Sequence, residues 1–155
     1  MIKNRPIEKQ DVAKCVAILG LLPRWFGIED SIIEYGKNLE TLDGFVAADE
    51  GEVVGFVGLK RYGDQSVEID VIGVRPDLRG SGIGTRLIEA VESNSASAIR
   101  LLHMKTLAPS DPDPNYAETR AFWLARGFVP MDAHELWGPE NPCLVMAKPV
   151  IGSDS

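Results

Sequence analysis

The chain has 155 residues, a length that can bury one hydrophobic core, and we expect a single domain over residues 1–150 followed by a frayed tail at 151–155. Its net charge of −7 disfavours nucleic acid as a partner, because binding to phosphates requires a basic face. The sequence contains neither a signal-peptide core nor an apolar run of about 20 residues, the length of a membrane helix. It therefore predicts a cytoplasmic protein without a membrane partner.

Two helices are predicted near the start of the chain. Apolar residues recur at helical spacing over residues 8–19. A second helix is expected over residues 31–39, with Asp30 or Ser31 as its cap. An irregular loop that contains a proline and a glycine separates the two helices.

Three strands follow in direct succession. The apolar runs at 45–48 and 53–59 are separated by a short Asp-Glu-Gly-Glu turn, and a second turn leads to a third run at 67–74. A parallel pair of strands needs a crossover of about a dozen residues. Strands joined this closely must therefore be antiparallel.

The second half of the chain alternates helices and strands. A buried helical stripe begins at Ile83, a strand is expected over 99–106, and a helix over 116–126 is expected to end at Gly127. A last strand is predicted at 144–148. The fold class is therefore α+β, in the order α-α-β-β-β-α-β-α-β, with a mixed, mostly antiparallel central sheet flanked by helices.

The cysteines and histidines do not suggest a metal site. Cys15 and Cys143 are far apart in the sequence, and neither His103 nor His134 has a second ligand residue at a metal-binding spacing. We therefore expect two free thiols and no bound metal.

A glycine-rich turn joins the strand at 67–74 to the next helix. Glycines there let the backbone approach a ligand, and the first amides of the helix and its dipole favour a phosphate or pyrophosphate. No lysine follows these glycines as a Walker A loop requires, and Thr85 stands where a GxGxxG motif needs its third small residue. The remaining pattern, [Arg/Gln]-x-x-Gly-x-[Gly/Ala], is matched by Arg79, Gly82 and Gly84.

Two motifs together carry a family resemblance. Residues 74–84, Val-Arg-Pro-Asp-Leu-Arg-Gly-Ser-Gly-Ile-Gly, resemble the acyl-CoA signature of the GNAT superfamily of N-acetyltransferases. Residues 122–128, Phe-Trp-Leu-Ala-Arg-Gly-Phe, resemble the second motif of that family, and the order of elements is similar over nearly the whole chain. The resemblance implies a GNAT fold, acetyl-CoA as the acyl donor, and transfer of the acetyl group to a primary amine.

By this resemblance, the cofactor lies on the glycine turn and along the end of the preceding strand. Backbone groups near Ile72 and Val74 would hold the pantetheine arm, and the turn would bind the pyrophosphate. The thioester would lie where this strand splays from the strand at 99–106. The implied cofactor-binding residues are Ile72, Gly73, Val74, Arg79, Gly80, Ser81, Gly82, Ile83, Gly84, Thr85, Tyr116 and Trp123.

A general base must take a proton from the acceptor's ammonium before the nitrogen can attack a thioester. Glu68 aligns with the catalytic glutamate of some GNAT members and is the first choice, while Asp70 is a candidate substrate contact or base. Strand alternation predicts that Asp70, Ile72 and Val74 share one face with Glu68, and that Ile69 and Val71 share the other. The alternative is that both carboxylates simply face solvent.

The sequence differs from the family pattern at the residue that usually protonates the thiolate leaving group. The usual tyrosine of the second motif is Trp123 here, and an indole N–H cannot deliver a proton at neutral pH. Tyr116, two helical turns earlier, is the candidate proton donor and also a candidate cofactor contact. Trp123 either packs on the pantetheine or fills the core.

The acceptor is the part of the reaction that the sequence determines least. Trp25 and Phe26 lie in the loop between the first two helices, so they are candidate walls of the acceptor pocket or anchors of the loop in the core. A small-molecule amine is the leading acceptor, and the alternatives are a protein or peptide acetyltransferase and a catalytically silent CoA-binding module. By analogy with relatives, an exposed last strand is a candidate contact of a homodimer.

Overall fold

The computed structural model describes residues 1–22, 29–95, 99–107, 114–134 and 143–150, which leaves Trp25, Phe26 and the predicted tail outside the described residues. The helices are α1 Val12–Gly20, α3 Glu29–Leu39, α4 Ile83–Ser95 and α5 Pro114–Ala125, with 3-10 turns at Lys9–Asp11 and Pro76–Leu78. The strands are β1 Ile2–Pro6, β2 Gly44–Asp49, β3 Glu52–Tyr62, β4 Ser66–Val74, β5 Leu101–Leu107, β6 Val129–His134 and β7 Cys143–Pro149.

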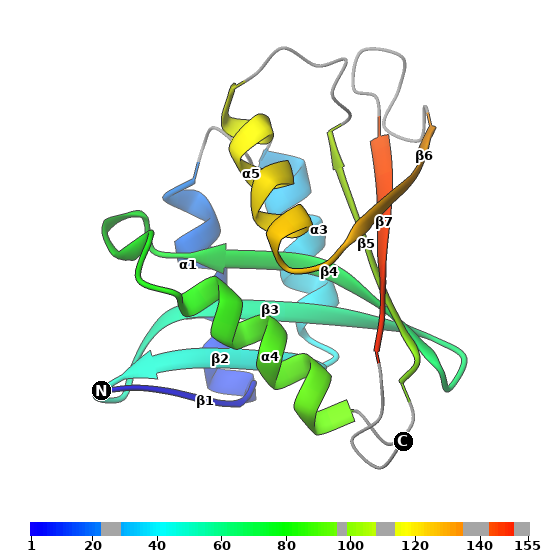
Figure 1. Ribbon diagram of the computed structural model, residues 1–155. Coiled ribbons are helices and arrows are strands. Elements are labelled where there is room, and N and C mark those ends of the chain that lie inside the picture. Colours follow the sequence, from blue (N-terminus) through cyan, green and yellow to red (C-terminus); the bar gives the residue numbers. More distant parts are fainter. Residues whose placement is uncertain (23–28, 96–98, 108–113, 135–142, 151–155) are drawn as a thin grey trace.

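These strands form one sheet in the order β1-β2-β3-β4-β5-β7-β6. Neighbouring strands are antiparallel except β4 and β5, which run parallel and are connected through α4 (Figure 1). The β2–β3 hairpin turns on Glu50 and Gly51, whose φ angles of 50° and 87° are the positive values that a two-residue hairpin loop prefers. The α+β class and the mixed, mostly antiparallel sheet are confirmed.

Helices cover the sheet on both faces. One apolar cluster packs α4 and α5 against the sheet through side chains that include Leu87 and Trp123. The other packs α1 and α3 against the opposite face through side chains that include Ile18 and Leu39. Figure 1 shows α4 in front of the sheet and α1 and α3 behind it. We call the two sides the α4 face and the α3 face.

Each helix and strand predicted from the sequence is present, with ends shifted by a few residues. Gly127, with a φ of 95°, follows the end of α5 as predicted. The predicted order is wrong in lacking β1 and β6. Both are edge strands of mixed polarity that contain a proline, Pro6 or Pro130, and such strands show no clear apolar alternation.

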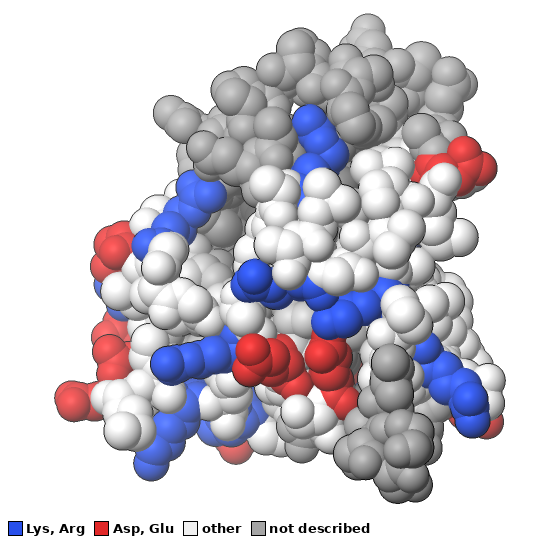
Figure 2. All heavy atoms as spheres, viewed as in Figure 1, with Lys and Arg blue, Asp and Glu red and all other residues white. Residues whose placement is uncertain are grey.

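Charged side chains of both signs lie beside one another on the α4 face (Figure 2). Lys148 of β7, for example, is paired with Glu92 of α4 at 2.6 Å between Nζ and Oε1.

Within the described residues, no helix has both the length and the apolar composition that crossing a membrane requires.

Candidate active site

The glycine turn between β4 and α4 has a left-handed backbone at two positions. Gly80 and Gly82 have φ angles of 82° and 85°, which other residues adopt only under strain. A Cβ at either position would meet no heavy atom within 4 Å, so the space beside the turn is open. The first amides of α4, which begins at Ile83, have no acceptor within the helix. Open space, a permissive backbone and a helix start together fit the phosphates of the expected cofactor.

The end of α5 packs directly on the start of α4. A Cβ at Gly84 would lie 3.3 Å from the ring of Phe122, so the two helices approach closely there. The guanidinium of Arg126 lies 5.4 Å from the centroid of the same ring and donates a hydrogen bond to Thr85 Oγ1. The two sequence motifs are therefore in contact in the folded protein.

Trp123 belongs to the core beneath this contact. Its side chain is 3% exposed, and its ring packs edge-on against Phe122 and Phe128, with centroids 5.2 and 5.0 Å apart. Core filling is thus the role of Trp123 that the structure shows, and its contact with the cofactor stays a prediction. Tyr116 lies in α5, but its side chain is outside the described part of the structure.

Strands β4 and β5 part in the middle of β4. They are paired only from Ser66–Leu101 to Glu68–His103, and beyond this point the described part of β4 continues to Val74 beside β3 alone. The predicted splay is confirmed, and its apex is Glu68. We call the opening between β4 and β5 beyond Glu68 the fork.

A β-bulge at Asp70 changes which side chains of β4 share a face. Gly58 of β3 pairs with Val71, and the next residue, Leu59, pairs with Ile69, so Asp70 has no counterpart on β3. Ile69 accordingly packs in the cluster of the α4 face and Val71 in the cluster of the α3 face. The prediction that these two residues share a face is wrong.

The bulge also overturns the alternation expected for the rest of β4. Ile72 and Val74 pack against the cluster of the α4 face, whereas Glu68 and Asp70 contact polar groups on the α3 face. One additional residue in a strand turns every following side chain to the opposite side. The fork therefore lies between the glycine turn and α4 on one face and two carboxylates on the other.

Glu68 is held at both of its carboxylate oxygens. Tyr62 donates its hydroxyl proton to Oε1 at 2.8 Å, and Lys105 Nζ donates to Oε2 at 2.5 Å, while the residue is only 6% exposed. Burial acts to raise the pKa of Glu68, but the two donors and the charge of Lys105 outweigh it and hold the pKa below its ordinary value. Glu68 is therefore a buried anion with its own fixed cation.

Tyr62 and Lys105 are site residues that the sequence patterns considered above did not indicate. In β5, His103 and Lys105 alternate with the buried Leu102 and Met104, and this period of two is the signal that places both polar side chains on the α3 face. The ring centroids of His103 and Tyr62 lie 5.4 Å apart, and burial lowers the pKa of His103. Lys105 therefore lies on the same face as Glu68, with its ammonium on the Glu68 carboxylate.

Asp70 is held less fully than Glu68. Asn38 Nδ2, on α3, donates to Oδ2 at 3.1 Å, and Lys60 Nζ lies 3.7 Å from Oδ1. Burial raises the pKa of Asp70, and the charge of Glu68 adds to this increase, against the lowering effects of Asn38 and Lys60. The two carboxylates of the fork are thus shifted in opposite directions from their ordinary pKa values.

The two cysteines have different surroundings. Burial raises the pKa of Cys143, and the charges of Lys105 and Glu68 also act on it, so this thiol lies near the fork, whereas Cys15 belongs to the cluster of the α3 face. Cys15 and Cys143 are both free and buried, which confirms the prediction of two free thiols. Burial raises the pKa of Cys15 to about 12, so its thiol stays protonated. In the described ranges, no three His, Cys, Asp or Glu side chains are grouped so that they could hold a metal ion.

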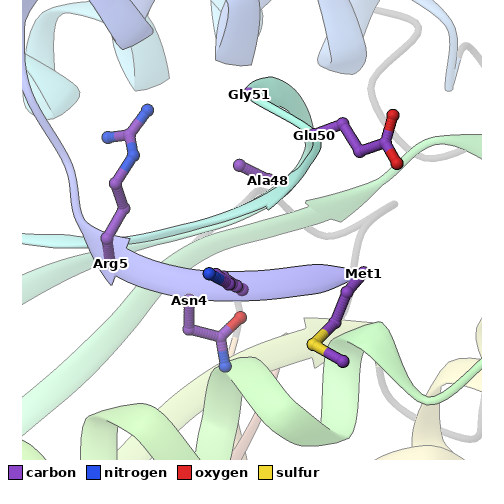
Figure 3. A pocket seen from close by; sticks show the side chains of 7 residues that line it. Met1, Asn4, Arg5, Ala48, Glu50 and Gly51 are labelled. Atoms are coloured by element: carbon purple, nitrogen blue, oxygen red, sulfur yellow. The ribbon is translucent and has the colours of Figure 1, made fainter.

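A surface hollow lies beside β1, at the edge of the sheet (Figure 3). Figure 3 shows Arg5 and Asn4 pointing to opposite sides of β1. Both are engaged in the fold, because Arg5 pairs with Asp11 and Asn4 donates to the backbone carbonyl of Arg86. Strands β2 and β3 separate the hollow from β4, so it is not part of the fork. Its lining consists of Met1, Lys3, Asn4, Arg5, Ala48, Glu50 and Gly51.

The model of the acetyltransferase (GNAT) domain family matches residues 41–130, which is more than half of the chain, and the chain belongs to this family. The match includes β2, β3, the fork strand β4 and the glycine turn. No curated protein sequence matches the chain significantly. The protein is therefore a GNAT acetyltransferase, an enzyme whose acyl donor is acetyl-CoA.

Solved structures similar to this chain have the same fold at low sequence identity. The ribosomal-protein-S18-alanine N-acetyltransferase from Escherichia coli is 18% identical with a TM-score of 0.77, over 99% of this chain and 96% of that one. The aminoglycoside 6′-N-acetyltransferase from Enterococcus faecium is 22% identical with a TM-score of 0.72, over 96% and 97%. The PaiA N-acetyltransferase from Thermoplasma acidophilum, in complex with coenzyme A, is 15% identical with a TM-score of 0.75, over 96% and 99%.

Proposed function

We propose that this enzyme transfers the acetyl group of acetyl-CoA to the primary amine of a small molecule. The observation that carries the proposal is the fork: it opens between the glycine turn and α4 on one side and two carboxylates on the α3 face. A cationic amine that approached from the α3 face would meet those carboxylates before it reached the fork. The name of the similar Enterococcus faecium enzyme, an aminoglycoside acetyltransferase, supports a small amine as acceptor.

In this proposal, backbone groups of the chain hold the acyl donor. When bound, acetyl-CoA supplies an activated thioester. Backbone amides from Arg79 to Gly84 would hold its phosphates, and backbone groups near Ile72 and Val74 would hold its pantetheine arm. The amide of Val74 is the proposed donor to the oxyanion.

Proton transfer is the remaining task of the site. A carboxylate of the fork accepts a proton from the acceptor's ammonium, and Glu68 is the choice that the resemblance to the family favours. Tyr116 is the proposed proton donor to the departing thiolate. Trp25 and Phe26 are proposed walls of the acceptor pocket, and the cytoplasmic location and the homodimer likewise stay proposals.

Acetylation of a protein or peptide is the second candidate. It is favoured by the similarity to the Escherichia coli enzyme, whose name gives a ribosomal protein alanine as its acceptor. The two candidates differ in their acceptors, and not in the residues that hold acetyl-CoA. A single assay with both kinds of acceptor therefore separates them.

The test is thiol release from acetyl-CoA in the presence of amines, amino acids, polyamines, aminoglycosides and short peptides. We expect release with at least one small primary amine and little or none with peptides. Peptide-only release would replace the proposed acceptor class by the second candidate. Gly82→Val is the control, because a β-branched residue at a φ of 85° distorts the turn and should weaken acetyl-CoA binding in calorimetry by about tenfold or more.

A further inference from the structure

We propose that Asp70, at the bulge, accepts the proton from the acceptor's ammonium, and that Glu68 with Lys105 and Tyr62 forms a clamp that holds the fork in place. This inference rests on the proposed function. The sequence makes both Glu68 and Asp70 candidates for the base, and the inference gives that role to Asp70 and a positioning role to Glu68. The geometry that supports it concerns the partners of each oxygen and the position of each residue relative to the apex of the fork.

Glu68 has no place for a second ammonium. Lys105 Nζ already lies 2.5 Å from Oε2, and the Tyr62 hydroxyl lies 2.8 Å from Oε1. An acceptor ammonium that reached Glu68 would have to lie beside the ammonium of Lys105, and like charges at that distance repel. Asp70 also has an ion-pair partner, Lys60, but that lysine is at 3.7 Å and 45% exposed, whereas Lys105 is at 2.5 Å and 26% exposed, so Lys60 is more easily displaced by an acceptor. A carboxylate paired in this way also has a reduced affinity for a proton.

The contacts of Glu68 instead connect three strands at the point where two of them part. Tyr62 lies on β3, Glu68 on β4 and Lys105 on β5, and the last paired position of β4 and β5 is Glu68–His103. The ion pair is mostly buried, with side chains 8% and 26% exposed. Such a pair fixes the separation of β4 and β5 at the apex, so Lys105 and Tyr62 are positioning residues.

Asp70 lies two residues beyond the apex, where β4 is no longer paired with β5. The bulge directs its side chain to the α3 face, and a bulge is a common way to aim a side chain at a site. Oδ2 accepts a hydrogen bond from Asn38, while Oδ1 forms a long ion pair with Lys60 Nζ, at 3.7 Å, which exceeds hydrogen-bond distance. Among the described residues, Oδ1 is therefore the carboxylate oxygen of the fork that is best placed to accept a new donor.

The surroundings of Asp70 suit this role. The groups facing it are Asn38 from α3, Lys60 from β3 and Glu68 from its own strand. Burial and the Glu68 charge raise the pKa of Asp70 more than Asn38 and Lys60 lower it, so it binds a proton more readily than an ordinary aspartate. In the reaction, an N–H bond of the ammonium breaks and an O–H bond forms at Asp70. The electron pair left on nitrogen forms a C–N bond at the thioester carbonyl, and the C–S bond then breaks. The nitrogen loses its second proton to water, the thiolate takes a proton from the proposed donor Tyr116, which regains one from water, and Asp70 returns its own proton to water.

The first experiment measures thiol release against pH for the wild type and for matched variants, with the best acceptor of the panel. Asp70→Asn should lower kcat by roughly 10²- to 10⁴-fold and abolish the loss of rate at acid pH that protonation of Asp70 causes. Lys60→Met should move that acid limb to higher pH, because it removes the nearest cation from Asp70. Lys105→Met, the matched lysine variant, should leave the position of the limb nearly unchanged.

Opposite outcomes would overturn the assignment. If Asp70→Asn retained the acid limb while Glu68→Gln lost it, Glu68 would be the base. If Glu68→Gln did not fold, Tyr62→Phe would serve in its place, since it removes a donor to Glu68 and leaves both carboxylates. Its acid limb should stay where the wild type has it, and a displaced limb would count against Asp70.

A second measurement needs no turnover and separates this inference from the proposed function. NMR titration of carboxyl carbons labelled in Asp and Glu should show Asp70 titrating above an ordinary aspartate and Glu68 below an ordinary glutamate. The reverse order would overturn the division of roles even if the enzyme acetylated amines. Absence of thiol release with every acceptor would overturn the proposed function, while the titration would still decide which carboxylate binds protons more readily.

Discussion

Two aspartates of this protein, the buried Asp11 and the partly buried Asp70, are held in opposite ways. Asp11, beside α1, is 1% exposed and accepts hydrogen bonds from both terminal nitrogens of Arg5, at 2.7 and 3.0 Å, and from the amide of Glu8 at 2.8 Å. Asp70, at the fork, accepts a hydrogen bond from Asn38 at 3.1 Å and has Lys60 at 3.7 Å. The Arg5 hydrogen bonds lower the pKa of Asp11, whereas burial raises the pKa of Asp70.

The difference separates a structural carboxylate from one suited to chemistry. Asp11 completes a capping box with Glu8 and connects β1 to the first helix, so its lone pairs are used by donors that do not move. Asp70 keeps an oxygen without a close donor among the described residues, and its charge is less well compensated. Glu68 resembles Asp11, because both of its oxygens have fixed partners. Stability and activity should therefore respond differently to the loss of each carboxylate.

The largest expected effect on stability is that of Asp11→Asn. It removes the buried anion from Arg5, and we expect the free energy of unfolding in urea to fall by about 2–3 kcal/mol, less than for a fully buried pair because Arg5 is 36% exposed. The folded pKa of Asp11 is lowered, so its contribution is present above the unfolded pKa of about 3.9 and is lost as pH falls through the folded value. The difference from wild type should accordingly shrink below about pH 4. A difference independent of pH would show that the ion pair is not its cause.

A smaller effect is expected for Glu68→Gln. The substitution leaves the partly buried ammonium of Lys105 without its anion, and we expect the free energy of unfolding to fall by about 1–3 kcal/mol. Lys105→Met should also destabilise the protein. The double variant should lose less than the sum of the two single losses, because each single change leaves one unpaired charge. Strictly additive losses would mean that Glu68 and Lys105 do not stabilise one another.

The smallest effect is expected for Asp70→Asn, which should not lower the free energy of unfolding at pH 7. The folded pKa of Asp70 is raised, so the native state binds more protons than the unfolded state between the two pKa values, and ionised Asp70 disfavours folding as pH rises. The stability of the variant relative to wild type should therefore increase from acid to neutral pH, opposite in sign to Asp11→Asn. Urea unfolding at acid and at neutral pH measures this change. A loss of stability at pH 7 as large as that of Asp11→Asn would show that the two aspartates do not differ in the way described.

The local pattern of the sequence determined most of the elements and the cofactor turn. Apolar periodicity predicted the helices and the inner strands, because burial on one side leaves a period of 3.6 or 2 in the residues themselves. The glycines at 80, 82 and 84 predicted a turn where the backbone can approach a ligand, and the structure has a turn there with positive φ at Gly80 and Gly82. The family also followed from local motifs, and its match over residues 41–130 confirms it.

The tertiary structure alone decided which side chains of β4 face one another. Period-two alternation assumes an unbroken register, and the bulge at Asp70 breaks it through pairing with β3, a strand whose alignment no local pattern specifies. For the same reason, the sequence placed Ile72 and Val74 beside Glu68, while the fold places them on the opposite face. The partners of the two carboxylates, Lys105 for Glu68 and Asn38 for Asp70, come from other strands and helices, and only packing between distant segments brings them together.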